Sequence, residues 1–201
     1  MRKLFLYSLI TIFTILGFSS CIIKPEFPSQ PSISFSSIVK KSFIDPNSGL
    51  PGDSVIIGIK FRDGNGDIGL TTSDTTGNFA PFLPDKSRNP FYYNYYCTIY
   101  RRNKFSGEYE RFTMFLSPPN NNIEANIHGR VPPLLENARP SPIEGELFYE
   151  PPTISDLYND SNIPDPTKLN KKDSIKFEVF IYDKALNKSN TIMTSAIFVN
   201  P

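Results

Sequence analysis

The chain has 201 residues, and its 21 Lys and Arg nearly balance its 20 Asp and Glu, which gives a formal net charge of +1. A near-neutral chain lacks the basic surface by which proteins bind nucleic acid, and this excludes that class of function. The 19 prolines do not suit helix interiors, while 17 Phe and 10 Tyr favour strands. The composition therefore predicts short strands and long loops, and the length predicts one domain.

The first 20 residues have the parts of a secretory signal: a positive head, an apolar run over residues 4–18 and two serines. A transmembrane anchor, the alternative, needs about 20 apolar residues, and this run is shorter. Residues 18–21, Phe-Ser-Ser-Cys, resemble the lipobox of bacterial lipoproteins, although Phe18 stands where Leu is commoner. The resemblance implies that residues 1–20 are a lipoprotein signal peptide and that lipid on Cys21 anchors the protein to a membrane. It implies an outer-membrane lipoprotein facing the periplasm or the cell surface.

Residues 21–37 contain several prolines and serines, which predicts a flexible tether and leaves residues 38–201 as the folded domain. Cys21 and Cys97 are the two cysteines. If Cys21 carries lipid, Cys97 has no partner in the chain, and we expect no internal disulfide. Because Cys97 alternates with apolar neighbours, it is predicted to be a small buried hydrophobe.

The clearest strand patterns lie at residues 54–62 and 175–181, where apolar and polar side chains alternate. Residues 70–90 and 153–172 are broken by prolines and are expected to be loops. Several antiparallel strands separated by turn signals predict an all-β sandwich or barrel. The remaining strands are expected at 33–43, 91–101, 108–116, 123–131, 143–150 and 191–199.

Two stretches resemble bacterial immunoglobulin-like domains. Residues 177–199 resemble their last hairpin, in which a strand ends in Asp-x-Ala-Gly-Asn, but Leu186 replaces the Gly. Residues 51–69 resemble an early strand that ends in Asp-x-x-Gly-Asp. Together these stretches are similar to a group of lipoproteins of the Bacteroidota with an immunoglobulin-like domain. The resemblance implies an immunoglobulin-like antiparallel β-sandwich of about seven or eight strands with long Pro-rich loops, and it implies no activity.

Two loops rich in Asp and Asn follow residues 54–62 and 175–182. If these segments are strands B and F of an immunoglobulin-like sandwich, the loops emerge at the same end. Clustered oxygens suit a hard cation such as Ca²⁺. However, in an EF-hand count Ile68 occupies the position that needs Gly, and Asx turns within each loop are the alternative explanation. The candidate metal ligands are Asp63, Asn65, Asp67, Asp74, Asp183 and Asn187.

Tyr92, Tyr96 and Tyr100 share one face of a predicted strand and form a candidate ligand face, because flat rings stack on sugars. Half-buried tyrosines that pack their rings and hydrate their hydroxyls are the ordinary alternative.

No nucleophile motif, zinc spacing or phosphate loop accompanies His128, the single histidine. Glu144 and Glu146 share a strand, but nothing in the sequence marks them as a catalytic pair. We therefore expect no enzyme. The expected function is a lipid-anchored binding or accessory module of the cell envelope, whose partner is an envelope protein or a glycan. The alternative is a carbohydrate-binding lipoprotein of a nutrient-uptake system, assisted by calcium.

Overall fold

A computed structural model describes residues 26–46, 49, 51–116, 121–124, 127–135, 139–151, 157–159, 163 and 165–199, with only the backbone at 114–116 and 121–124. Apart from one short 3-10 helix, Gly77–Phe79, the regular structure in these residues is β-structure. The predicted signal peptide and Cys21 lie outside the described residues. No helix in the described part of the chain has the length and apolarity to cross a membrane.

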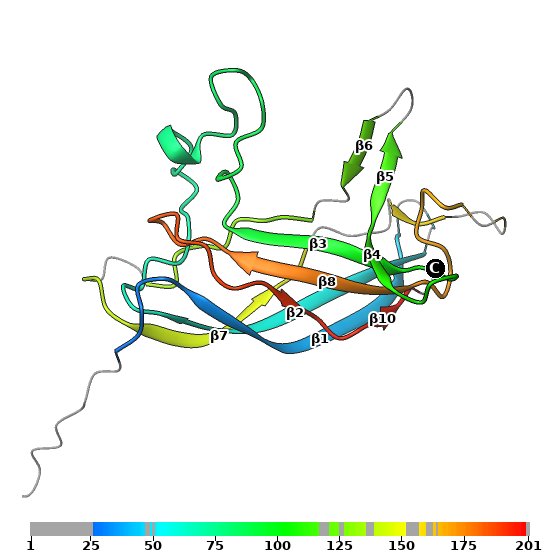
Figure 1. Cartoon of the computed structure of the whole chain (residues 1–201), viewed down its shortest axis with the longest axis horizontal. Coiled ribbons are helices and arrows are strands. Elements are labelled where there is room, and N and C mark those ends of the chain that lie inside the picture. Colours follow the sequence, from blue (N-terminus) through cyan, green and yellow to red (C-terminus); the bar gives the residue numbers. More distant parts are fainter. Residues whose placement is uncertain are drawn as a thin grey trace, which may run out of the picture.

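Two antiparallel sheets pack face to face (Figure 1). The predicted all-β sandwich is confirmed. The first sheet has the order β1-β2-β7, formed by Ser32–Ile44, Pro51–Asp63 and Ile143–Tyr149. The second has the order β10-β8-β3-β4, formed by Ile197–Phe198, Ser174–Ile181, Tyr95–Arg102 and Tyr109–Arg111, with β9 (Ile192–Met193) also paired to β8. A separate hairpin of β5 (Thr113–Leu116) and β6 (Asn121–Glu124) projects from the sandwich.

The strand order corresponds to that of an immunoglobulin-like sandwich. Strands β1, β2 and β7 take the places of A, B and E, and β10, β8, β3 and β4 take those of G, F, C and C′. Ten strand segments are described where seven or eight were expected. The structure has more strands because two expected strands are each divided. The strand expected at 108–116 forms β4 and β5, and the strand expected at 191–199 forms β9 and β10.

The core lies between the sheets, where alternate residues of β2, β3 and β8 point inward. Fully burying one such apolar side chain contributes about 1.5–3 kcal/mol. Cys97 is buried, as predicted, and this burial raises the pKa of its thiol well above the ordinary value. The hydrophobic residues in these strands that are fully shielded from solvent are Ile57, Ile59, Tyr95, Cys97, Ile99, Ile175, Phe177 and Val179.

The structure corrects one domain boundary and one strand end. The strand expected at 33–43 is confirmed as β1, so residues 32–37, also assigned above to the tether, belong to the sandwich and pair with β2. Strand β3 begins at Tyr95 rather than at residue 91. Just before it, the Asn94 side chain accepts a hydrogen bond from Val131 N (2.7 Å) and donates one to Val131 O (3.1 Å). At this position the side chain of Asn94, and not a continuous series of strand hydrogen bonds, joins the segment before β3 to a neighbouring loop.

The loop expected at 153–172 contributes to the core, which the sequence did not indicate. Tyr158 and Leu169 are almost fully buried and pair with each other through a parallel bridge. The Tyr158 hydroxyl donates to the buried carboxylate of Asp53 (2.5 Å), and Lys40 lies 3.4 Å from the same carboxylate. The loop thus closes one end of the sandwich, and Asp53 has a basic partner.

Candidate functional site

The two Asp/Asn loops meet at one end of the sandwich, as the sequence predicted. Ile68 and Asp183 form an isolated antiparallel bridge. Lys184 N donates to the Asp67 carbonyl (3.0 Å), and Ala185 N donates to Asp67 Oδ2 (3.1 Å). Both the backbone and a carboxylate of the first loop therefore bind the second loop directly. We call the group Asp63, Asn65, Asp67 and Asp183 the acid-loop site.

Each loop is also stabilised by its own turn chemistry. In the first, Asp63 Oδ2 accepts a hydrogen bond from Asp67 N (3.0 Å). In the second, Asp183 Oδ1 accepts from Asn187 N (2.7 Å), and Asp183 Oδ2 accepts from Asn187 Nδ2 (2.8 Å). Leu186, which replaces the usual Gly, has a φ of 67°. These bonds position the carboxylates, but they leave some acid-loop oxygens unused.

Three carboxylates converge at this end. Asp63, Asp67 and Asp183 each contribute one oxygen to a group in which the oxygens lie within 4.8 Å of one another. Asp63 and Asp183 are almost completely buried, and Asp67 is half-buried. Three of the oxygens at this end are buried and have no hydrogen-bond partner among the residues that the structure describes: Asp63 Oδ1, Asn65 Oδ1 and Asp67 Oδ1. Unsatisfied buried acceptors are rare in folded proteins, so these three oxygens require an explanation.

The electrostatic environment of the acid-loop site opposes its negative charge. Burial, followed by the charges of Asp67 and Asp183, raises the pKa of Asp63 to about 6. Burial, followed by the charge of Asp183, also raises the pKa of Asp67. Closely spaced carboxylates in a desolvated site favour the protonated form or a bound cation.

Two other candidate ligands have different roles. Asp74 Oδ2 accepts hydrogen bonds from Thr71 N (2.8 Å) and Thr71 Oγ1 (2.9 Å) and lies 3.2 Å from Lys184 Nζ. Asp74 does not join the three clustered carboxylates. Asn187 supports Asp183 through the two hydrogen bonds described above.

A pocket of about 520 Å³ opens beside the acid-loop site. Asn65 and Asp67 line it together with two basic residues, Lys184 and Arg139. The pocket therefore brings solvent up to Asn65 and Asp67, and any bound anion would be near positive charge. No pattern in the sequence marks Arg139, which lies in a separate loop.

The N-terminal segment docks onto the same end of the sandwich. Gly64 N donates to the Pro28 carbonyl (2.9 Å), and Gln30 Nε2 donates to the Lys188 carbonyl (2.7 Å). A Cβ on Gly64 would collide with the backbone oxygens of Phe27 and Pro28. Glycine at this position therefore lets the segment approach, and in Figure 1 the blue segment leaves the fold beside the loop end.

The three tyrosines of the candidate ligand face do not form one platform. Tyr96 stacks on Phe180, with ring centroids 4.7 Å apart, while the Tyr100 hydroxyl donates to Glu178 (3.0 Å). Tyr92 lies before β3, with the Arg130 guanidinium 4.8 Å from its ring centroid. The aromatic group that does form includes Tyr92, whose ring lies edge-on to Tyr93 with centroids 5.0 Å apart. Its members are Phe91, Tyr92, Tyr93, Tyr96, His128, Phe180 and Tyr182.

The residues considered above for catalysis make structural contacts. His128 Nδ1 lies 3.1 Å from Cys97 N and 3.0 Å from the Cys97 carbonyl. Glu144 pairs with Arg62 (3.0 Å), and Glu146 accepts a hydrogen bond from Ser36.

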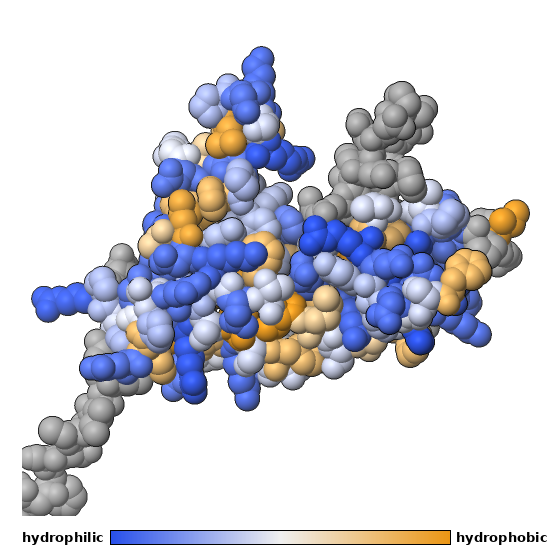
Figure 2. All heavy atoms as spheres, in the orientation of Figure 1, coloured by the Kyte–Doolittle hydropathy of each residue, from blue (hydrophilic) through white to orange (hydrophobic). Residues whose placement is uncertain are grey.

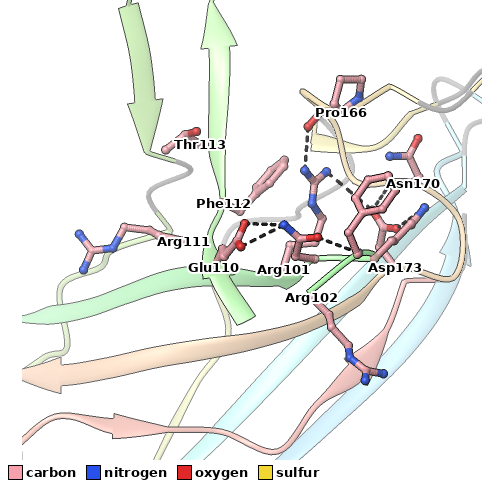
Figure 3. Close-up of a pocket in the computed structure, with 12 residues that line it drawn as sticks. Arg101, Arg102, Glu110, Arg111, Phe112, Thr113, Pro166, Asn170 and Asp173 are labelled. Carbon is pink, nitrogen blue, oxygen red and sulfur yellow. Dashed lines mark hydrogen bonds and ion pairs between the residues drawn. The ribbon is translucent and has the colours of Figure 1, made fainter. Parts of the chain in front are cut away.

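A second pocket, of about 480 Å³, lies at the far end of β3 (Figure 3). Arg101, Arg102, Lys104 and Arg111 line it. Arg101 donates to the carbonyls of Pro166 and Lys168 (2.8 Å each), and Lys104 lies 3.2 Å from the buried carboxylate of Asp173. Part of this positive charge therefore holds the neighbouring loop in place.

A scan against protein-family models, a search of curated proteins and a search of solved structures each found no match.

Proposed function

We propose that the chain is a non-catalytic binding or accessory module of the cell envelope, held at the outer membrane by lipid on Cys21. The observation that carries this proposal is the contact between the N-terminal segment and the end of the sandwich that contains the acid-loop site, which we call the acid-loop end. Phe27 follows Cys21 by six positions, a span of at most about 20 Å. Lipid on Cys21 would therefore hold the acid-loop end close to the membrane surface.

In this orientation the opposite end of the sandwich faces away from the membrane. Strand β3 begins at Tyr95, near the acid-loop end, and ends at Arg102, on the wall of the second pocket. A strand of this length spans roughly 25 Å. Figure 2 shows the apolar side chains of the visible face as separate groups among hydrophilic ones. The second pocket, whose lining has four basic residues and two acidic ones, Glu110 and Asp173, would face away from the membrane and could meet an anionic partner.

The anchoring step predicts a specific effect of Cys21→Ser. In a bacterial host with a lipoprotein pathway, the full chain should incorporate labelled palmitate and enter the detergent phase after detergent extraction. Cys21→Ser should lose the label and leave the detergent phase, because serine offers no thiol for lipid. Cys97→Ala serves as the matched control and should remain labelled. Membrane retention of Cys21→Ser without label would instead indicate an uncleaved anchor.

A carbohydrate-binding lipoprotein of a nutrient-uptake system is the second candidate function. It is favoured by the partly exposed aromatic group around Tyr96 and Phe180, since such rings can stack on sugar faces. We predict that a screen of glycans identifies a ligand whose binding is at least tenfold weaker in Phe180→Ala. Phe105→Ala, which removes a fully exposed ring between β3 and β4 and outside this group, should bind as the wild type does. A blank screen with folded protein would contradict this candidate.

A further inference from the structure

The buried carboxylates in the part of the chain that the structure describes fall into two kinds. Asp53 and Asp173 each have a basic side chain close by: Lys40 at 3.4 Å and Lys104 at 3.2 Å. Among the described residues, no ion pair joins a Lys or Arg to any of the three carboxylates of the acid-loop site. Because an unpaired buried charge is costly, the acid-loop site lacks a counter-charge that the chain supplies to its other buried acids.

We propose that this counter-charge is one Ca²⁺ ion, bound by Asp63, Asp67 and Asp183 together with the amide oxygen of Asn65. The proposal does not depend on lipidation of Cys21 or on the identity of the partner.

The unused oxygens support a bound ion rather than a closed network of turns. Turn chemistry accounts for Asp63 Oδ2, which accepts from the backbone, but Asp63 Oδ1 has no partner although the residue is fully buried. The same is true of the buried Oδ1 atoms of Asn65 and Asp67. A cation among these oxygens would satisfy all three acceptors and neutralise the charge that the carboxylates share.

The type and spacing of these oxygens fit calcium. Ca²⁺ takes six to eight oxygen ligands at about 2.3–2.6 Å, so two ligands on opposite sides of the ion lie roughly 4.8 Å apart. The three carboxylate oxygens lie within 4.8 Å of one another, and one ion can therefore contact all of them. The acid-loop site offers neither imidazole nor thiolate, the ligands that favour zinc.

The remaining positions around the ion can be filled by water. Asn65 and Asp67 line the 520 Å³ pocket, so the ion would be reached from solvent on that side. Sites completed by water and built on surface loops are typical of extracellular calcium modules, whose dissociation constants are on the order of 10⁻⁴–10⁻³ M. We expect an affinity in this range.

Calcium binding would also stabilise the docked N-terminal segment. Gly64, in the first loop, holds Pro28, and Lys188, in the second loop, holds Gln30. An ion that joins the two loops would therefore strengthen the support for this segment. Amide hydrogen exchange over residues 27–31 should be slower with calcium present.

The test is a calorimetric titration of the full chain, solubilised in detergent and stripped of metal with EDTA. We expect one Ca²⁺ per chain, and at least tenfold weaker binding for Asp67→Asn and Asp67→Ala. Asp74→Asn is the matched control: it removes an acid from the adjacent loop segment but leaves the three clustered carboxylates intact, so its affinity should stay within about twofold of wild type. Circular dichroism of each variant establishes that it is folded.

Three results would overturn the proposal. The first is an absence of both heat and thermal stabilisation at 10 mM Ca²⁺ with folded wild-type protein. The second is calcium binding that Asp67→Ala leaves unchanged, which would place the ion elsewhere. The third is tighter binding of Mg²⁺ or Zn²⁺ than of Ca²⁺, which would assign the acid-loop site to another metal.

Discussion

In calcium-free buffer at pH 7.5, Asp63→Asn should increase the free energy of unfolding by about 1–2 kcal/mol relative to wild type. Asparagine keeps the shape of the side chain and can still accept the hydrogen bond that Asp67 N donates to Asp63. It removes a buried charge whose pKa is raised to about 6 by burial and by Asp67 and Asp183. Mutating a fully buried polar residue normally destabilises a protein, so a stabilising effect would be diagnostic of charge repulsion.

The pH dependence of this effect follows from the sign of the pKa shift. The Asp63 pKa is higher in the folded protein (about 6) than the ordinary value of 3.8, so folding favours its protonated form. Below about pH 4 the carboxyl is neutral in both states, and wild type and Asp63→Asn should differ little. As the pH rises from about 4 to 6, the wild type loses stability relative to the variant, and above pH 6 the difference should be constant.

Calcium should cancel most of the difference in stability between the two proteins. At ten times its dissociation constant, an ion that binds only the folded state stabilises it by about 1.4 kcal/mol. This corresponds to about 3–6 °C in midpoint temperature for a domain of this size. Wild type should gain this increment, whereas Asp63→Asn should gain little. Thermal unfolding of both proteins with EDTA and with calcium measures all four values, and equal calcium shifts would contradict the assignment of Asp63 as a ligand.

The sequence predicted the sandwich and the meeting of the two loops because both rest on local, repeated signals. Strands β2 and β8 each bury one face, so apolar side chains recur at every second position of their sequences. Once both strands end in Asp-rich turns, the geometry of a sandwich brings the turns together. The bridge between Ile68 and Asp183 is the outcome of that geometry.

The composition of the acid-loop site was only partly predictable. Counting along the chain from Asp63 pointed to Asp74 as a ligand in the first loop. In the structure the chain turns away after Gly69, where Leu70 N donates to the Val131 carbonyl (2.9 Å), and Asp74 pairs with Lys184. The third carboxylate comes instead from Asp183 in the second loop, a candidate that the sandwich argument supplied and this count did not. A count within one loop cannot identify a ligand that tertiary packing supplies.

The docked N-terminus and the core residues of the 153–172 loop could not be predicted for the same reason. Proline and serine near residue 28 indicate a tether, and no periodic pattern marks Gly64 as its contact. Tyr158 and Leu169 lie in a polar, proline-containing segment without alternation, yet both are buried. Their burial depends on where the sandwich leaves space, which is a property of the whole fold.

Gly69→Ala should be the most destabilising single change in the acid-loop region, with an expected loss of at least 3 kcal/mol in the free energy of unfolding. Gly69 has a φ of 122°, which residues with a side chain rarely adopt. A Cβ at this position would also lie 2.5 Å from the Pro132 carbonyl oxygen and would collide with the backbone of Pro133. Backbone atoms cannot rotate aside, so residues 66–70 would have to move.

This movement should damage the acid-loop site as well as stability. Leu70 N is held by the Val131 carbonyl and Leu134 N by the Ile68 carbonyl, so the two segments are joined on both sides of Gly69. If these two segments separate, Ile68 loses its bridge to Asp183. Asp67 then also loses its hydrogen bonds to the second loop. Calcium binding should therefore be lost in Gly69→Ala under conditions in which the protein remains folded.

Gly77→Ala provides the matched control, because Gly77 has a positive φ of 58° but nothing within 4 Å of an added Cβ. This variant has a positive φ without the collision, and residues with a side chain adopt its φ more readily than the 122° of Gly69. We therefore expect it to cost only about 1–2 kcal/mol. Denaturant unfolding of both variants, analysed with a common slope, compares the two positions. Equal losses of unfolding free energy in the two variants would contradict this explanation. They would show that the backbone conformation at Gly69 requires glycine and that the close approach of Pro132 and Pro133 does not.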